Sequence, residues 1–468
     1  MEADWLSILP FLVVIPIAIY TKQVLPGLLA GLLVGAYLMT PELIGGMQTM
    51  LFYVVQALID ENNIKIIVFL YAFSGLIGMI KATGGIKGFV EIAAEKITTK
   101  KQALILTYVS TIGTFSAPTF RFVTIAPIMK ALLKKVPMSK KELGFVIETT
   151  ATPVIVLIPV ATAFVGYMVS VIQISTENIG IMEDPYALFI QSIPFNFFAF
   201  VIILLGIYLS FFHHSKTDDP TQMEEPIKDE EDWHECHPVV SRELPDKPFN
   251  LLVPIMLVIS LTLFLTWWDG NAQGYDFFQS FIQADVLEAM VIALLITVFL
   301  SIAFFLIQKF PLGNLIESFI FGGNELMSVI ILLSVVWGLS SVTDDLGFSG
   351  FVTAHTDWIP EQFITPLLFV FGAGISYFIG SAWGTWGILM PLGVSLTAVT
   401  DVSLPVIIGA VFASGSFGAL ASPLSDDTNT IAKILGISVM EYARYKLKPA
   451  LIAAGITAAL YTGVSFLY

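Results

Sequence analysis

Residues 414–430, SGSFGALASPLSDDTNT, interrupt one of the last apolar stretches of this 468-residue chain. Small residues lead into Pro423, and the adjacent carboxylates of Asp426 and Asp427 follow. Proline removes a backbone hydrogen bond, and a carboxylate in hydrocarbon costs about 2.5–3.5 kcal/mol on the insertion scale. The stretch therefore predicts either an interfacial turn, in which one aspartate caps the next helix, or a broken helix that holds a polar site.

The composition indicates which solvent surrounds this stretch. Hydrophobic residues make up 56% of the chain and charged residues only 13%, whereas soluble domains contain about 25% charged residues. Apolar runs long enough to cross about 30 Å of hydrocarbon recur throughout. The plainest are Trp5–Tyr20, Leu25–Met39, Ile64–Ile80, Ala187–Phe212, Leu251–Trp268, Val286–Ile307 and Ala450–Tyr468. The sequence predicts an all-α polytopic membrane protein in a lipid bilayer.

One long polar segment divides the chain near its middle. Between Lys216 and Lys247 there are eleven Asp or Glu and four Lys or Arg residues, a net charge of −7 out of the total of −15. Such a composition is typical of a solvated linker, because it cannot bury enough apolar surface to fold. We expect a first transmembrane unit over 1–213, the acidic linker over 214–249 and a second transmembrane unit over 250–468.

The two units resemble a duplication. At an offset of 264 residues, three pairs of prolines coincide: Pro127 with Pro391, Pro159 with Pro423, and Pro185 with Pro449. The apolar runs agree, since Leu25–Met39 matches the run that begins at Val286. Internal repeats of this kind indicate two copies of one structural unit.

Charge indicates the relative orientation of the copies. Segments 81–101 and 130–141 each contain five lysines, whereas their counterparts 344–362 and 394–405 contain no Lys or Arg. The next loop reverses the pattern, because 173–186 is acidic and 437–450 carries Arg444, Lys446 and Lys448. Short cytoplasmic loops carry the excess of basic residues. We therefore expect an inverted repeat in the cell's inner (plasma) membrane, with both termini external and the linker cytoplasmic.

The polar interruptions also occur in pairs. The first unit contains GTFSAPT (113–119) and TTATPVIVLIP (149–159), and the second contains GSAWGT (380–385) and the opening stretch, 414–430. Non-helical backbone at membrane depth persists only where it is buried in protein or lines a cavity. In secondary transporters, inverted repeats place such breaks around a midplane site. We expect each repeat to contribute a helical hairpin and a broken transmembrane helix to one shared cavity.

The opening stretch has the ligands of a small hard cation. Na⁺ binds about five or six oxygens from carboxylates, hydroxyls, amides and backbone carbonyls. Within one or two helical turns the stretch offers Ser422, Ser425, Asp426, Asp427, Thr428 and Asn429. Two carboxylates facing one cavity would let a proton and a cation compete for the same site. We expect at least one of the aspartates to bind a coupling ion, although one of them can also cap a helix.

The first unit adds further candidates. Glu148, followed by Thr149, lies about two turns beyond the basic residues Lys140 and Lys141 and beside a break, where it serves as an ion ligand or as a snorkelling or capping residue. Arg121, in the first hairpin, could bind a substrate carboxylate bidentately, form a salt bridge to Glu148 or an aspartate, or lie at an interface. The hairpins offer further polar groups for a substrate: Ser116 and Thr119 in the first, and Ser381, Trp383 and Thr385 in the second.

Several of these segments together resemble the NhaC family of Na⁺/H⁺ antiporters, within the ion-transporter superfamily. They are GSAWGTWGILMP (380–391), SPLSDDTN (422–429), MSKKELGFVIETTATPVIVLIP (138–159) and VVWGLSSVTDDLG (335–347). The resemblance implies that Asp426 stands at the family's aspartate, that Asp427 stands where the family often has threonine, and that Glu148 stands at its acidic position. We expect Na⁺ to bind at Asp426 and Asn429, with Asp426 as the central ion and proton ligand and with Glu148 and Thr149 serving from the opposite half.

The first hairpin departs from this pattern. Many relatives have an acidic pair where this chain reads APTFRF (117–122), and Arg121 is present instead. We expect a Na⁺/H⁺ antiporter that exchanges cytoplasmic Na⁺ for external H⁺. The alternative is a Na⁺- or H⁺-coupled carrier or exchanger of a small carboxylate or amino acid. The sequence shows no phosphate-binding loop and no nucleophile placed with a base, so we expect no enzyme, no nucleic-acid partner and no cofactor beyond the ions. Related folds suggest a homodimer by analogy.

Overall fold

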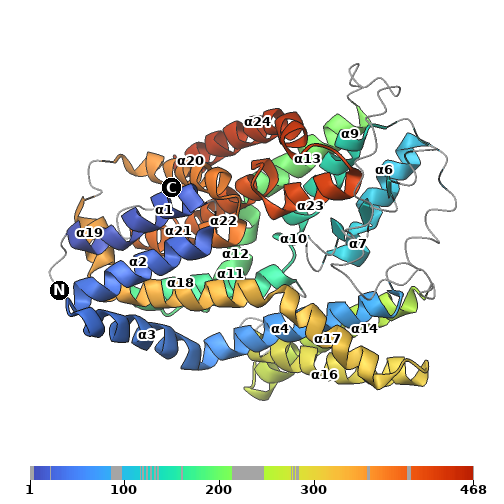
Figure 1. The fold of residues 1–468 in the computed structure, drawn as a ribbon, viewed down its shortest axis with the longest axis horizontal. Helices are drawn as coiled ribbons and strands as arrows, with labels where there is room; N and C mark the ends of the chain where they lie inside the picture. The colour runs from blue at the N-terminus through green and yellow to red at the C-terminus, as the bar shows by residue number, and fades with distance from the viewer. Residues whose placement is uncertain are drawn as a thin grey trace.

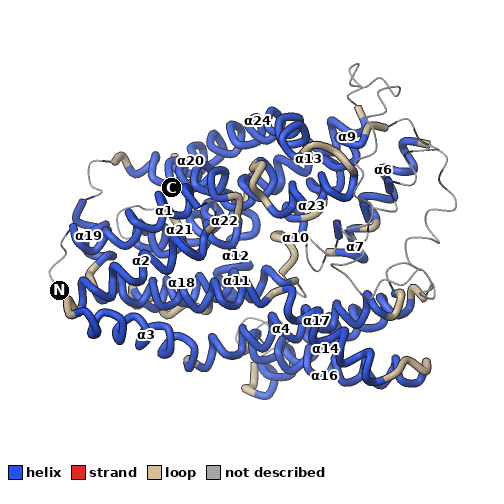
Figure 2. Tube along the Cα trace, viewed as in Figure 1, coloured by secondary structure: helices blue, strands red, loops and turns tan. Residues whose placement is uncertain are grey.

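The computed structural model describes residues 5–21, 23–85, 99–115, 138–159, 162–212, 247–275, 284–355, 359–397 and 402–466, together with residues 97, 118, 121–122, 125–126, 129–130, 133, 136, 277 and 280. Every regular element in this part of the chain is a helix (Figure 2). The all-α prediction is therefore confirmed. Most of the acidic linker lies outside the described residues.

The helices fall on either side of the linker. Before it come η1 (Trp5–Ile8), α1 (Leu9–Thr21), α2 (Val24–Met39), α3 (Leu43–Ile59), α4 (Glu61–Ala82), α6 (Lys100–Val109), α7 (Thr111–Thr114), α9 (Lys140–Thr149), α10 (Thr152–Ile155), α11 (Ala163–Asn178), α12 (Pro185–Ser192), η2 (Ile193–Phe195) and α13 (Phe197–Phe211). After it come α14 (Phe249–Ala272), α16 (Val286–Ile307), α17 (Leu312–Glu325), α18 (Met327–Asp345), α19 (Phe348–His355), α20 (Glu361–Ile379), α21 (Ala382–Leu396), α22 (Leu404–Ala421), α23 (Asp426–Leu435) and α24 (Val439–Ser465).

The lengths of these helices suit a membrane. Among the described residues, seven helices are long and apolar enough to cross one, if α22 and α23 are taken together, and an eighth span results if α12 to α13 is counted as one. The first three helices, α1 to α3, are apolar but shorter. The chain is therefore a multi-pass membrane protein.

One expected span is bent. The apolar run 187–212 does not form a single helix, because η2 follows α12 and the chain turns by 42° before α13. Pro194 lies at the start of η2 and Asn196, at the bend, has a non-helical backbone (φ −78°, ψ 65°). Proline and a short polar residue therefore break the run where hydropathy alone predicts continuity.

The helices lie mostly along the long axis of the molecule (Figure 1). Helix α22 is almost entirely buried, and it packs against α20, α21, α12 and α13. On one side, α4 packs closely against α17 beside α14 and α16. A Cβ added at Gly78 would lie 2.3 Å from the carbonyl oxygen of Ser318 and 2.9 Å from the Cα of Gly322, so these two backbones are in direct contact. Helices α9, α13, α23 and α24 gather toward the end of the molecule opposite α19 (Figure 1).

Candidate functional site

The break between α22 and α23 is an ordered structure centred on Pro423. Proline has no backbone N–H, so the carbonyl of Ala419 loses its helical partner, and the hydroxyl of Ser425 donates to it instead at 2.6 Å. Thr428 Oγ1 donates to the carbonyl of Ser422 at 2.7 Å. Ser425 also caps α23 by accepting from the backbone N–H of Asp427. The break therefore ends one helix and starts another whose first turn carries two carboxylates.

The break between α9 and α10 has a similar cause. Pro153 cannot donate to the carbonyl of Thr149, and α9 ends there. Ala151, between the two helices, has a non-helical backbone (φ −99°, ψ −104°). Glu148 therefore lies in the last turn of α9, immediately before the break, and it is only 1% exposed.

The two breaks lie against each other. Thr152 Oγ1 donates to Asp427 Oδ2 at 2.6 Å, joining residues 275 positions apart in the sequence. Thr428 Oγ1 lies 3.5 Å from Glu148 Oε1. Each break thus contributes one carboxylate and one hydroxyl to the same buried polar cluster. We call this cluster, formed by Glu148, Thr152, Asp427 and Thr428, the break cluster.

A lysine from a fourth helix, α24, contacts the break cluster. Lys446 Nζ of α24 lies 2.5 Å from Glu148 Oε1 and 2.6 Å from Thr428 Oγ1, and Lys446 is 0% exposed. Tyr442, one turn earlier on α24, donates its hydroxyl to the other oxygen of Glu148. The sequence suggested instead that Lys446 belongs to a basic cytoplasmic loop. That placement was wrong for Lys446, because α24 begins at Val439 and carries the lysine about two turns into the helix.

The sequence contains a signal that could have located Lys446. The buried positions of α24 recur at helical spacing on one face: Tyr442, Lys446, Ala450, Ala453, Thr457 and Tyr461. Because residues four apart lie on the same face of a helix, a lysine in register with that series must face the protein interior. Thr152, one of the two hydroxyl groups in the break cluster, lies inside the predicted break but was not singled out as a ligand.

The two aspartates of α23 face different surroundings. Asp427 is partly buried and contacts Thr152, whereas the side chains of Asp426 and Asn429 are exposed. The amide of Asn429 donates to the carbonyls of Pro423 and Ser425, at 3.2 and 2.8 Å. The structure therefore joins Asp427 to Thr152 and Thr428 to Glu148, and it leaves Asp426 and Asn429 on the outer side of the helix.

The other predicted ligands take local roles. Thr149 donates its hydroxyl to carbonyls of α9 and packs against Gly206 of α13, where a Cβ would lie 2.9 Å from Thr149 Oγ1. Ser422 Oγ accepts from the backbone N–H of Leu424 at 3.0 Å. Ser422 contributes to the cluster through its carbonyl, which anchors Thr428.

The turn between α20 and α21, where the second hairpin was expected, abuts the α22–α23 break. Gly380 adopts a left-handed conformation (φ +77°), and a Cβ there would lie 2.7 Å from the backbone carbon of Leu424. Ser381 caps α21 by accepting from the N–H of Gly384, and Thr385 donates to the carbonyl of Ser381. The hydroxyls of these two residues are therefore engaged within the hairpin. Trp383 packs edge-on against Phe164 and Tyr167, with ring centroids 4.6 and 4.9 Å away.

Arg121 is a second fully buried cation, with 0% exposure. Its guanidinium donates to five acceptors: Thr107 O, Ser110 Oγ, Thr114 Oγ1, Ile147 O and Thr150 Oγ1. Within the described part of the chain it forms no ion pair, neither with Glu148 nor with the aspartates of α23. Ser116 and Thr119, the other predicted residues of this hairpin, lie outside the described residues.

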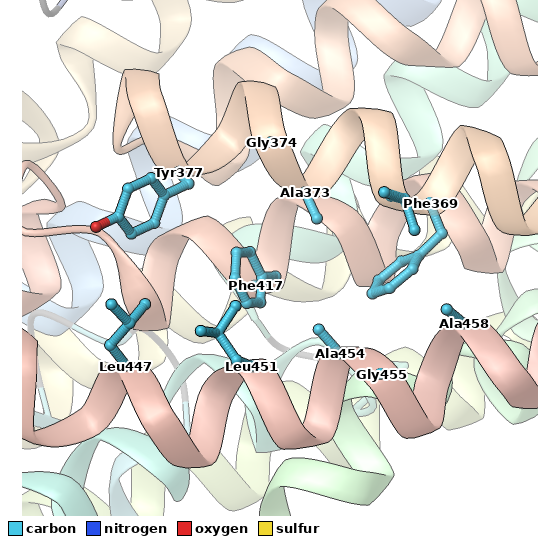
Figure 3. Close-up of a pocket in the computed structure, with 11 residues that line it drawn as sticks. Phe369, Ala373, Gly374, Tyr377, Phe417, Leu447, Leu451, Ala454, Gly455 and Ala458 are labelled. Carbon is cyan, nitrogen blue, oxygen red and sulfur yellow. The ribbon is translucent and has the colours of Figure 1, made fainter.

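A separate apolar groove of about 510 Å³ runs between α20 and α24 (Figure 3). It is lined by aromatic, aliphatic and glycine residues, including Phe369, Tyr377, Phe417 and Leu451. The hydroxyl of Tyr377 is the single polar side-chain group in this lining, so the groove lacks the oxygens that a cation site needs.

Curated relatives match the whole chain or its parts. An uncharacterized protein of Haemophilus influenzae is 23% identical over an alignment of 478 positions, which covers 99% of this chain and 91% of that protein. The malate-2H⁺/Na⁺-lactate antiporter of Bacillus subtilis is 31% identical over 153 residues, 31% of each chain. The Na⁺/H⁺ antiporter NhaC of Alkalihalophilus pseudofirmus is 24% identical over 136 residues, 29% of this chain and 28% of that protein.

Solved structures show the same fold. The chain aligns with MtrF of Neisseria gonorrhoeae at a TM-score of 0.63 and 13% identity, over 89% of this chain and 84% of MtrF. It aligns with the YdaH transporter of Alcanivorax borkumensis at a TM-score of 0.57 and 13% identity, over 89% and 88% of the two chains. Residues 154–465, two thirds of the chain, match the Na⁺/H⁺ antiporter family. This match and the NhaC relative confirm the resemblance drawn from the motifs, and the chain is a secondary transporter that belongs to the Na⁺/H⁺ antiporter family.

Proposed function

We propose that this protein exchanges cytoplasmic Na⁺ for external H⁺ and binds both at the break cluster. The observation that carries the proposal is the contact between the two helix breaks, where Thr152 reaches Asp427 and Thr428 reaches Glu148. Carboxylates and hydroxyls at a buried break are the ligands that a partly dehydrated Na⁺ requires. A carboxylate that binds either Na⁺ or a proton allows exchange when the site opens alternately to the two sides of the membrane.

Asp427, rather than Asp426, is the main ion and proton ligand in this proposal, which reverses the roles that the family pattern implies. Asp427 and Glu148 supply the charge, Thr152 and Thr428 supply hydroxyls, and the carbonyl of Ser422 lies next to them. Asp426 and Asn429 take a secondary role, because their side chains lie on the exposed side of α23.

We also propose that 1–213 and 250–468 are inverted repeats joined by a cytoplasmic linker over 214–249, in an inner membrane with both termini external. The helix bounds support the repeat. Adding 264 to the bounds of α2 gives 288–303, which falls inside α16, and adding it to those of α4 gives 325–346, against 327–345 for α18. The same sum applied to α9 starts at 404, the first residue of α22.

The experiment uses proteoliposomes that contain a pH-sensitive dye and an imposed proton gradient. Addition of Na⁺ or Li⁺ without any organic solute should collapse the gradient, whereas choline should leave it intact. A gradient that is unaffected by any alkali cation would overturn the proposal.

A second candidate function is coupled exchange of a small carboxylate. It is favoured by the Bacillus subtilis relative, whose name states malate and lactate as its substrates. The geometry of Arg121 weighs against a carboxylate there, because five protein acceptors already occupy its donors. Uptake of labelled malate or lactate by the same proteoliposomes, with no response to Na⁺ alone, would favour this second function.

A further inference from the structure

Lys446 occupies a position that is unfavourable for a lysine. It lies in a membrane-spanning helix and is completely buried, whereas lysines near helix ends usually extend their ammonium groups to the interface. Burying a charge requires close partners, and a buried ion pair is weak evidence for stability. The location of this charge therefore calls for a functional explanation.

The surroundings of the ammonium resemble those of a bound cation. A lysine ammonium has three N–H donors. Lys446 Nζ has three partners: Glu148 Oε1 at 2.5 Å, Thr428 Oγ1 at 2.6 Å and the ring face of Tyr442, whose centroid is 4.7 Å away. A carboxylate, a hydroxyl and an aromatic face are the groups that bind a small monovalent cation.

Two of the three partners of Lys446, Glu148 and Thr428, belong to the break cluster, but the lysine itself comes from another helix. Glu148 lies on α9 and Thr428 on α23, next to the two breaks, whereas Lys446 lies on the long helix α24. A second cation placed between Glu148 and Thr428 would have to share their oxygens with the ammonium at contact distance. Two like charges at that distance repel each other strongly in a buried site.

We propose that Lys446 is a tethered counter-cation, whose ammonium takes the place of the transported cation between Glu148 and Thr428 and must leave Glu148 when Na⁺ binds. This inference rests on the proposed function, because it assumes that Na⁺ enters the break cluster. The empty carrier then keeps a paired carboxylate, and binding of the lysine and of Na⁺ exclude each other.

The first test compares the purified wild-type chain with the Lys446→Met variant, at one fixed pH in choline and in Na⁺. Methionine keeps the apolar stem and removes the charge, so Glu148 is left buried without a cation. Thermal unfolding should start at a lower temperature in choline, and Na⁺ should stabilise the variant more than the wild type. The apparent Kd for Na⁺, taken from the shift of Tm with concentration, should be at least about tenfold lower in the variant.

The matched control is Lys81→Met, which removes the ion pair of Lys81 with Glu325 between α4 and α17. Its response to Na⁺ should equal that of the wild type. A Lys446→Met variant that responds to Na⁺ no more than the wild type would overturn the proposal. A variant that does not fold in choline but folds in Na⁺ supports it, and one that folds in neither condition contradicts it.

A second measurement uses the wild type and does not depend on a variant. Reductive methylation with formaldehyde and a hydride donor labels accessible lysines, and mass spectrometry compares Lys446 with Lys81. Saturating Na⁺ should increase the labelling of Lys446 at least about threefold, since an ammonium displaced from its carboxylate loses about that much protection or more. Labelling of Lys81 should not change.

The outcomes separate this inference from the proposed function. If wild-type proteoliposomes show no Na⁺-driven proton movement, the result contradicts both the proposed function and this inference. If Na⁺-driven proton movement is normal but the labelling of Lys446 does not depend on Na⁺, the result contradicts only the proposal that Lys446 is a tethered counter-cation.

Discussion

Arg121 and Lys446 are both completely buried cations, but their partners differ in kind. Arg121 donates to hydroxyls and carbonyls of α6, α7 and the end of α9, whereas Lys446 contacts a carboxylate, a hydroxyl and an aromatic ring. Arginine presents five donors in a rigid planar fork, and lysine is a compact charge on a flexible stem. The difference suggests that Arg121 fixes the shape of the first broken helix and that Lys446 can leave its partner.

The position of Arg121 supports a fixed role. Its contacts with Ile147 O and Thr150 Oγ1 lie on either side of Glu148, at the end of α9 where carbonyls lack helical partners. Arg121 therefore holds the backbone that presents Glu148, without touching the carboxylate. Lys446 touches the carboxylate itself.

The largest effect should come from breaking the Lys446–Glu148 pair on one side only. Glu148→Gln or Lys446→Met alone should destabilise the protein by about 3–5 kcal/mol in choline, because each leaves one charge buried and unpaired. The double variant should cost less than either single change. Thermal unfolding of the four proteins tests this cycle, and additive losses would show that the pair is not coupled.

The next largest effect should distinguish the two aspartates. Asp427→Asn should reduce Na⁺-driven proton movement by about 100-fold, equivalent to about 2.7 kcal/mol, because it removes the charge that accepts a hydrogen bond from Thr152 in the break cluster. Asp426→Asn is its matched control, and we expect a reduction of about threefold or less, since an exposed charge is well screened. The reverse ranking would return the central role to Asp426.

A smaller effect should follow from replacing the planar guanidinium group of Arg121. Arg121→Lys keeps the charge but cannot satisfy all five acceptors, so the free energy of unfolding should fall by about 2 kcal/mol. The maximal transport rate should decrease, while the KM for Na⁺ should stay within about twofold because the guanidinium does not touch the cation. A large rise in KM at an unchanged maximal rate would instead place Arg121 in the binding site.

The smallest effect should come from Thr152. Thr152→Val removes the hydroxyl that donates to Asp427 and keeps the shape of the side chain. The KM for Na⁺ should rise about three- to tenfold, equivalent to the 0.5–1.5 kcal/mol of one hydrogen bond. Thr152→Ser retains the hydroxyl and should transport like the wild type. Equal KM values in all three proteins would place the cation away from Thr152.

The sequence predicted much of the architecture because its signals are local. Long apolar runs predicted α4, α14, α16 and α24, whereas α18, α20 and the α22–α23 span were not among the plainest runs. Pro423 and Pro153 lie at breaks that were expected. The two breaks were also expected to share a cavity, and the contact of Thr152 with Asp427 agrees with that expectation. The bend at Asn196 was not predicted, because the high mean hydropathy of residues 187–212 hides Pro194 and Asn196 within the run.

The roles inside the site were harder to predict, since they depend on how each helix is rotated. Adjacent residues on a helix point about 100° apart, so Asp426 is exposed while Asp427 contacts Thr152. The Ser425 cap and the bond from Thr428 to the carbonyl of Ser422 set this rotation, and neither is visible in the pattern. Lys446 was placed in a loop because the distribution of positive charge does not show where a helix begins.

The most direct test of the account is Na⁺-driven proton movement by the wild type and the Glu148→Gln variant in dye-loaded proteoliposomes. Glu441→Gln is the control, because it removes a carboxylate from the partly exposed pair with Lys141 and leaves the break cluster intact. We predict that Na⁺ collapses the proton gradient with the wild type and the control, and that Glu148→Gln shows no response although it is folded and reconstituted. Full activity of Glu148→Gln would contradict the account.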